Sequence, residues 1–143
     1  MEIILLGVSD AISDEKQPNT HLIIKSGAQH VLVDCPDNPL PRFRKAGIVY
    51  QELNHIVLTH FHPDHVGGVA TLLMDLWLLG RQNTLHIYGL EYTIDRVAGM
   101  MGLYNWGAWP NFYPVEMHRI QDKAFSEVLV TNELRIIASP VCH

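Results

Sequence analysis

The sequence lacks the features that mark secreted, membrane-spanning and nucleic-acid-coating proteins. It has only two cysteines, Cys35 and Cys142, which are too few for a disulfide framework and predict a reducing, cytoplasmic location. No apolar run approaches the roughly 18 residues that a membrane span needs, because Asp75 and Gly80 interrupt the longest candidate. The net charge of −5 argues against a broad basic surface for coating nucleic acid. The N-terminal run at 1–6 lacks a basic segment and a cleavage site, so it predicts a strand rather than a signal peptide.

The order of apolar runs and turn residues predicts one α/β layered domain over residues 1–143. Short β-rich runs, separated by Gly, Pro and Asn, predict strands at 2–7, 20–26, 30–35, 55–60, 84–89 and near 115–120, and a hairpin over 127–139. Apolar residues at helical spacing predict helices at 40–48, 66–80 and 90–101.

The stretch THFHPDHVGG, residues 59–68 and called the signature below, places His60, His62, Asp64 and His65 within six positions after an apolar strand. Side chains alternate in an extended segment, so the first three are expected on one side. His65 would begin the next helix and turn toward the same point. Imidazole and carboxylate ligands suit zinc, iron or manganese better than calcium or magnesium. Two ions are conceivable, one on His60 and His62 and another on Asp64 and His65; the alternative is a polar loop with incidental histidines.

The other histidines and the aromatic residues have weaker patterns. Five histidines stand alone in predicted strands and are expected to be structural or solvated: His21, His30, His55, His86 and His118. The aromatic-rich loop at 104–114 is expected to pack against helices or a partner, rather than to stack on bases as a lid.

The signature resembles the HxHxDH motif of the metallo-β-lactamase superfamily, and VLVDC, HIVLTH and LHIYG around it are similar to the ribonuclease Z branch and its phosphodiesterase relatives. This resemblance implies an αββα sandwich of which the chain supplies roughly the first half, cut short at its C-terminal end. It implies one metal ion on His60, His62 and His143 and a second on Asp64 and His65. Asp34 would orient the ligand loop, although a turn aspartate is an equally good interpretation.

The resemblance implies a two-metal phosphodiesterase that attacks with a metal-bound hydroxide, with Asp64 orienting it, on tRNA 3′ ends or a related phosphodiester. The cofactors would be two divalent ions, zinc first, with manganese or iron as alternatives. A tRNA precursor is a candidate partner, and the missing half or another copy in a homodimer is expected to cover the sheet. The residues at 7–20 and 66–73 depart from the ribonuclease Z pattern. These departures argue against tRNA maturation but do not affect the expected metal chemistry. Hydrolysis of a lactone, thioester, sulfate ester or β-lactam, and a non-catalytic metal-binding module, remain alternatives.

Overall fold

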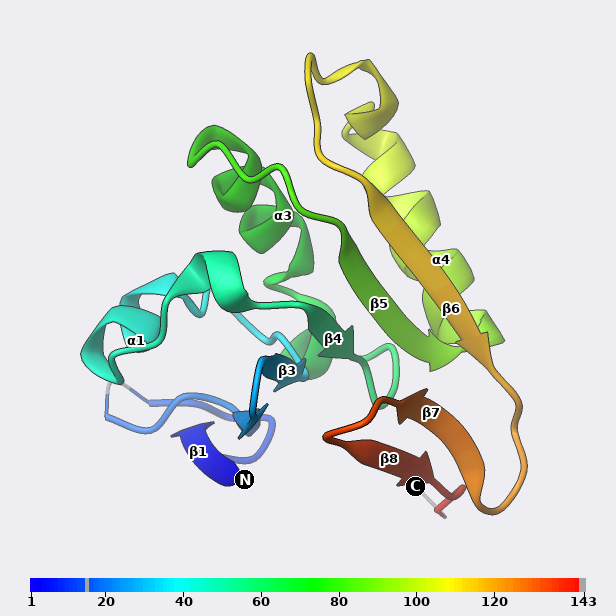
Figure 1. The fold of residues 1–143 in the computed structure, drawn as a ribbon. Helices are drawn as coiled ribbons and strands as arrows, with labels where there is room; N and C mark the ends of the chain where they lie inside the picture. The colour runs from blue at the N-terminus through cyan, green and yellow to red at the C-terminus, as the bar shows by residue number, and fades with distance from the viewer. Residues whose placement is uncertain (15, 142–143) are drawn as a thin grey trace.

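A mixed six-stranded sheet organises the chain in a computed structural model, which describes residues 1–14 and 16–141 (Figure 1). Its strands lie side by side in chain order: β1 (Glu2–Gly7), β2 (His21–Ser26), β3 (Gln29–Val33), β4 (His55–Val57), β5 (Leu85–Leu90) and β6 (Val115–Ile120). The first three strands pair antiparallel, and β3 to β6 run parallel. The parallel strands therefore all end at one edge of the sheet.

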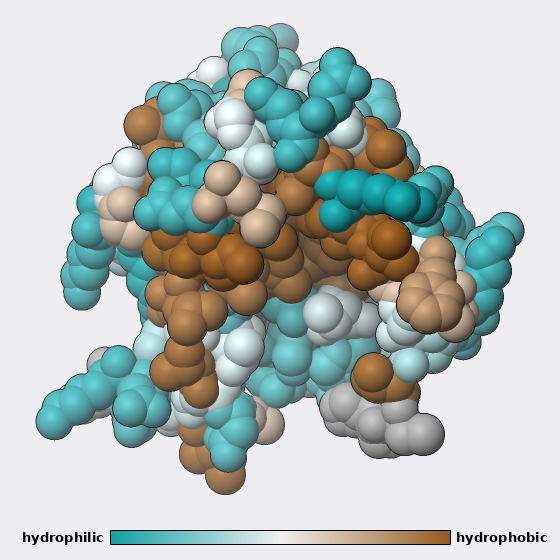
Figure 2. All heavy atoms as spheres, turned by 60° about the horizontal axis from the view of Figure 1, so that its bottom comes forward, coloured by the Kyte–Doolittle hydropathy of each residue, from teal (hydrophilic) through white to brown (hydrophobic). Residues whose placement is uncertain are grey.

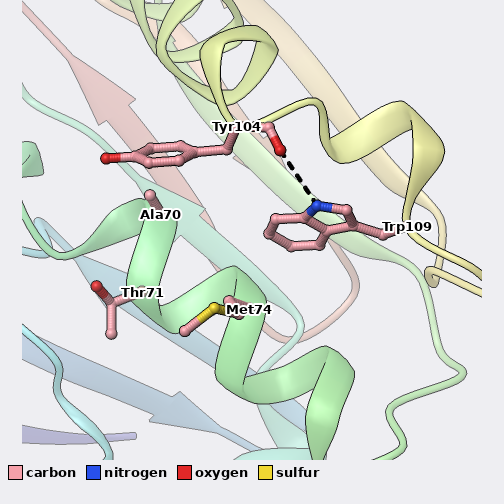
Figure 3. A pocket seen from close by; sticks show the side chains of 5 residues that line it. All are labelled: Ala70, Thr71, Met74, Tyr104 and Trp109. Atoms are coloured by element: carbon pink, nitrogen blue, oxygen red, sulfur yellow. Dashed lines mark hydrogen bonds between the residues drawn. The ribbon is translucent and has the colours of Figure 1, made fainter.

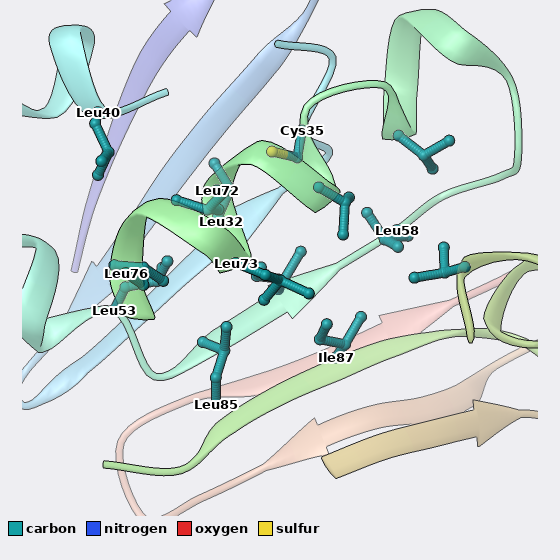
Figure 4. Close-up of a cluster of buried hydrophobic side chains, with 14 of the residues drawn as sticks. Leu32, Cys35, Leu40, Leu53, Leu58, Leu72, Leu73, Leu76, Leu85 and Ile87 are labelled. Atoms are coloured by element: carbon teal, nitrogen blue, oxygen red, sulfur yellow. The ribbon is translucent and has the colours of Figure 1, made fainter. Parts of the chain in front are cut away.

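Helices cover one face of this sheet and form the main core (Figure 4). They are α1 (Leu40–Lys45), α2 (Pro63–Val66), α3 (Val69–Leu78) and α4 (Glu91–Leu103), with short 3₁₀ turns at Tyr50–Glu52 and Trp106–Ala108. Leu72, Leu73 and Leu76 of α3 are fully buried against Ile56 of β4 and Ile87 of β5. Burying side chains of this size stabilises the fold by about 1.5–3 kcal/mol each, so α3 is a main contributor to the core.

The opposite face is covered only in part, by the hairpin of β7 (Ser126–Val130) and β8 (Arg135–Ala138). Val128 and Leu129 of the hairpin pack with Val31, Val57 and Tyr88 in a second apolar cluster. Ile3 and Leu5 of β1 stay 55% and 62% exposed. Figure 2, which brings the bottom of Figure 1 forward, shows a broad apolar area on this side of the molecule, as expected for half of a sandwich.

The α/β fold class and the C-terminal hairpin are confirmed, while two predicted elements differ. The helix predicted at 66–80 is two helices, because the chain turns at Gly67 and Gly68. The strand predicted at 55–60 ends at Val57: Leu58 still donates to the Tyr88 carbonyl of β5, but the N–H of Thr59 donates to the Asp34 carboxylate instead of to a strand. No helix within the described ranges is long and apolar enough to cross a membrane.

Candidate metal centre

The signature lies at the carboxyl end of β4, beside the carboxyl end of its parallel neighbour β3. Open α/β sheets bind their ligands at this edge. Asp34 directly follows β3 and has a left-handed backbone with φ of 60°, which aspartate tolerates better than most residues. Its own N–H donates to the carbonyl of Val57 at 2.9 Å, so the turn that carries its carboxylate is fixed to β4.

The carboxylate of Asp34 joins the two strand ends. Its Oδ1 accepts a hydrogen bond from the N–H of Thr59 at 2.8 Å, which is why the β4 ladder does not continue to this residue. Its Oδ2 lies 2.7 Å from Nδ1 of His65. A carboxylate can only accept here, so Nδ1 of His65 carries the proton and Nε2 is left with its lone pair. This is the carboxylate–histidine pairing by which proteins orient metal-ligating imidazoles.

The four residues of the signature come together in space. Nε2 of His60 lies 3.1 Å from Nδ1 of His62, and the ring centroids of His60 and His65 are 4.0 Å apart. Oδ2 of Asp64 lies 3.4 Å from Nε2 of His65. Asp64 is not in an extended segment as predicted, because Pro63 starts α2 and places both Asp64 and His65 on that helix. The remaining predicted ligand, His143, lies outside the described residues.

Backbone contacts hold the signature against the loop after β3. The N–H of Cys35 donates to the carbonyl of His65 at 2.7 Å, and the N–H of Gly68 donates to the carbonyl of Cys35 at 2.8 Å. A Cβ atom on Gly67 would lie 2.9 Å from the carbonyl oxygen of Pro36, and one on Gly68 would overlap the backbone of Asp37. The two glycines therefore permit close approach of two backbones, which fixes His65 over Asp34.

These residues fit a divalent transition metal. Three imidazoles and a carboxylate are the ligands that zinc prefers. In a tetrahedral site with bonds of about 2.0–2.1 Å, ligand atoms lie about 3.3 Å apart, close to the 3.1 Å between the His60 and His62 nitrogens. The pairing of His65 with Asp34 leaves the ligating nitrogen of that ring without a proton, as coordination requires.

A groove lies at the carboxyl ends of β5 and β6, next to the signature. It contains Tyr92 and Arg119, and the Tyr92 hydroxyl accepts a hydrogen bond from the N–H of Phe61 within the signature at 3.4 Å. Asp95 holds the Arg119 guanidinium through bonds of 2.7 and 3.0 Å. Glu91 and Asp122 also line the groove, so carboxylates surround this guanidinium.

The aromatic loop packs against α3, as one of its two interpretations predicted. Trp109 stacks on Trp77 with centroids 5.0 Å apart. Tyr104 and Trp109 from the loop, with Ala70, Thr71 and Met74 from α3, line a shallow pocket in which the Trp109 Nε1–H donates to the Tyr104 carbonyl (Figure 3). Cys35 is fully buried, and burial raises the pKa of its thiol, so it behaves as a small core residue.

Sequence reasoning missed a second group of histidines. His55, His86 and His118, expected to stand alone, lie side by side with Glu116 on the sheet face opposite the helices. We call these four residues the face cluster. These residues come from three strands. Only the strand register could have indicated the cluster, because it places His55 beside His86 and His86 beside Glu116.

The fold matches solved metallo-β-lactamase-fold proteins. Human tRNase Z, short form, superposes with a TM-score of 0.67 at 23% identity, over 87% of this chain and 48% of that one. The metallo-β-lactamase fold protein YhfI from Bacillus subtilis superposes with a TM-score of 0.66 at 16% identity, over 90% of this chain and 47% of that one. These likenesses show the fold. A ribonuclease Z from Methanococcus maripaludis is 29% identical over all of this chain and 46% of its own length.

The chain therefore has a metallo-β-lactamase fold and is similar to proteins named ribonuclease Z. The chain spans about half the length of the curated relatives it matches. A family model described as Anti-Pycsar protein Apyc1 matches residues 1–97, more than half of the chain. The chain belongs to that family.

Proposed function

We propose that this chain supplies the metal-binding half of a hydrolase that cleaves phosphodiester bonds. The observation that carries the proposal is the convergence of His60, His62 and His65 at one point, with His65 held by Asp34 at 2.7 Å. A polar loop with incidental histidines does not account for a buried aspartate that orients one of the rings.

In this proposal His60, His62 and His143 hold one divalent ion, and Asp64 and His65 hold a second, with zinc first and manganese or iron as alternatives. Such ions, when bound, lower the pKa of water and neutralise the charge that develops on phosphate oxygens. The protein's own contribution is positional. Asp34 keeps the His65 ring and its tautomer fixed, and Asp64, 3.4 Å from that ring, orients the attacking water and accepts its proton.

Two substrate classes are consistent with this chemistry. The ribonuclease Z relatives favour a tRNA precursor cut at its 3′ side. Residues 7–20 and 66–73, which depart from the ribonuclease Z pattern, favour the other class, a small nucleotide phosphodiester.

Two other functions remain in competition. A lactone, thioester, sulfate ester or β-lactam hydrolase would use the same ions, and substrate screening separates it from a phosphodiesterase. A non-catalytic metal-binding module would bind metal without turnover. We expect the partly covered sheet face to be covered by the other half of the sandwich or by a second copy in a cytoplasmic homodimer. The leaving-group acid is expected in the missing half.

The test is metal content and hydrolysis of bis-p-nitrophenyl phosphate by the full-length gene product, before and after chelation. We expect about two ions per chain at the signature, counted as the difference from protein in which His60, His62, Asp64 and His65 are alanine, and turnover that is lost on chelation and regained with zinc or manganese. Turnover that survives complete metal removal would contradict the proposal. Comparison of a tRNA precursor with cyclic mononucleotides then assigns the substrate class.

A further inference from the structure

The face cluster lies on the open side of the sheet, away from the signature. Leu85 and Ile87 of β5 point into the helix-covered core, so the alternating residues His86 and Tyr88 point to the other face. His86 is the second residue of β5, toward the end of the strand opposite the signature edge. The face cluster and the signature are therefore two separate groups of potential ligands.

Three side chains of the face cluster converge on one point. Nδ1 of His86 lies 3.1 Å from Nε2 of His118 and 3.3 Å from Oε2 of Glu116. The remaining side of the triangle, from His118 Nε2 to Glu116 Oε2, is 3.8 Å. Ligand atoms around a tetrahedral zinc ion lie about 3.3 Å apart, so the triangle has the dimensions of one face of such a site.

Neighbouring rings fix the two imidazoles. The Tyr88 ring stacks on His118 with centroids 4.5 Å apart and planes 12° apart, and the His55 ring stacks on His86 at 5.3 Å. Nε2 of His55 is engaged by the side chain of Gln29 at 2.9 Å, so His55 supports His86 rather than joining the triangle. The two imidazole ligands are thus positioned by packing before any ion arrives, which lowers the entropic cost of binding.

We propose that His86, Glu116 and His118 form a second, separate binding site for a divalent transition-metal ion, with zinc as the preferred ion. Two imidazoles and one carboxylate are a zinc ligand set that leaves a fourth position for water or another donor. The ligands connect adjacent parallel strands, β5 and β6, so a bound ion would tie the outer strand β6 to the rest of the sheet.

The test is a Co²⁺ titration followed by visible absorption, in full-length protein whose signature is disabled by replacing His60, His62, Asp64 and His65 with alanine, called the signature-disabled protein. We expect one Co²⁺ per chain with tetrahedral-type bands, displaced by Zn²⁺. Adding His118→Ala or His86→Ala should weaken the binding at least 100-fold, and Glu116→Gln about 10-fold. Binding that is unchanged by His118→Ala, or absent from the signature-disabled protein, would overturn the proposal.

Glu52→Gln provides the matched control. The Glu52 side chain is 54% exposed and lies 3.4 Å from Nδ1 of His30. The Glu116 side chain is similar, 59% exposed and 3.3 Å from Nδ1 of His86. Glu52, however, contacts one histidine, whereas Glu116 contacts two. Its replacement should leave the titration unchanged. An equal loss in Glu52→Gln and Glu116→Gln would mean adventitious surface binding and would refute the site.

A second measurement guards against misfolded variants. Zinc added to signature-disabled protein with ¹⁵N-labelled histidine should shift the ring nitrogens of His86 and His118 from free to coordinated values and leave His30 unchanged. The absence of these shifts at one equivalent of zinc would also refute the site. The signature is disabled in all of these experiments. Absence of metal binding by the face cluster would therefore leave the proposed hydrolase untouched, and absence of phosphodiester turnover in the wild type would leave the face-cluster site untouched.

Discussion

The signature and the face cluster are both groups of histidines with a carboxylate, but they are built in different ways. His60, His62 and His65 come from one short segment, which the backbone of the β3 loop holds in place. His86 and His118 come from strands whose residues are 32 positions apart and are held by ring stacking. The signature lies at the end of the sheet, where ligands bind, whereas the face cluster lies on its face.

This difference predicts how well each group should tolerate amino-acid substitutions. The signature depends on two glycines and a buried aspartate, so few replacements there are neutral. The face cluster depends on register, which every hydrogen bond of β5 and β6 maintains, so its geometry should survive most single changes outside the cluster. The predictions below test this contrast, beginning with the largest effect.

Asp64→Asn should lower phosphodiester turnover by about 10²- to 10⁴-fold, because an amide neither accepts the proton nor binds the ion as a carboxylate does. Steady-state kinetics on bis-p-nitrophenyl phosphate would measure it. Glu127→Gln is the control: it also removes one carboxylate, but one that pairs with Arg135 on the β7–β8 hairpin. Equal turnover in Asp64→Asn and wild type would remove Asp64 from the mechanism.

Metal-free protein should lose stability as the pH falls from about 6.5 to about 4. Burial, with the neighbouring His86 and His118, lowers the pKa of His55 to about 4 from 6.5. In that window the unfolded chain binds a proton that the folded chain does not, so the free energy of unfolding falls by up to about 3 kcal/mol. Burial also lowers the pKa of His118 and adds to the effect.

Urea unfolding at pH 7.5 and pH 4.5 in the presence of chelator would measure this loss. His55→Gln should reduce the difference between the two pH values, although the variant is less stable at neutral pH. That comparison retains the groups that face these histidines: Gln29 and Tyr88 contact His55, and Glu116 faces His86. A difference of the same size in His55→Gln and wild type would assign the pH dependence to other groups.

Asp34→Asn should weaken metal binding or turnover by about 10- to 100-fold, the usual effect of removing the carboxylate behind a ligating histidine. Zinc affinity and kcat would be measured together. Asp37→Asn is the matched control, since Asp37 lies in the same loop but binds Arg42 at 2.6 Å. If both variants lose the same affinity, the loop fold rather than the Asp34–His65 pair would be responsible.

Tyr88→Phe should have the smallest effect. The Tyr88 hydroxyl lies 3.4 Å from Nδ1 of His55, a long hydrogen bond whose loss costs no more than about 1 kcal/mol. The substitution keeps the aromatic ring that stacks on His118, so metal binding by the face cluster should persist. Thermal unfolding and a Co²⁺ titration would check both, and loss of binding would show that the hydroxyl, not the ring, orders the cluster.

The sequence was informative where local pattern decides the structure. The β-rich runs predicted the strands and the terminal hairpin, and the spacing of His60, His62, Asp64 and His65 predicted a common site. The break between α2 and α3 was not predictable, because it depends on contact of Gly67 and Gly68 with a loop thirty residues earlier. The face cluster was missed for the same reason, since pairing between strands brings His86 to His118.

The order of the strands in the sheet has a consequence for synthesis of the protein. Each strand from β2 to β6 pairs with the strand that precedes it in the chain. A growing chain can therefore add strands to the last edge as they leave the ribosome, without waiting for a distant partner. By this route Asp34 and the signature meet once β4 has paired with β3, before β5 and β6 are translated, so the candidate metal centre can assemble early in translation.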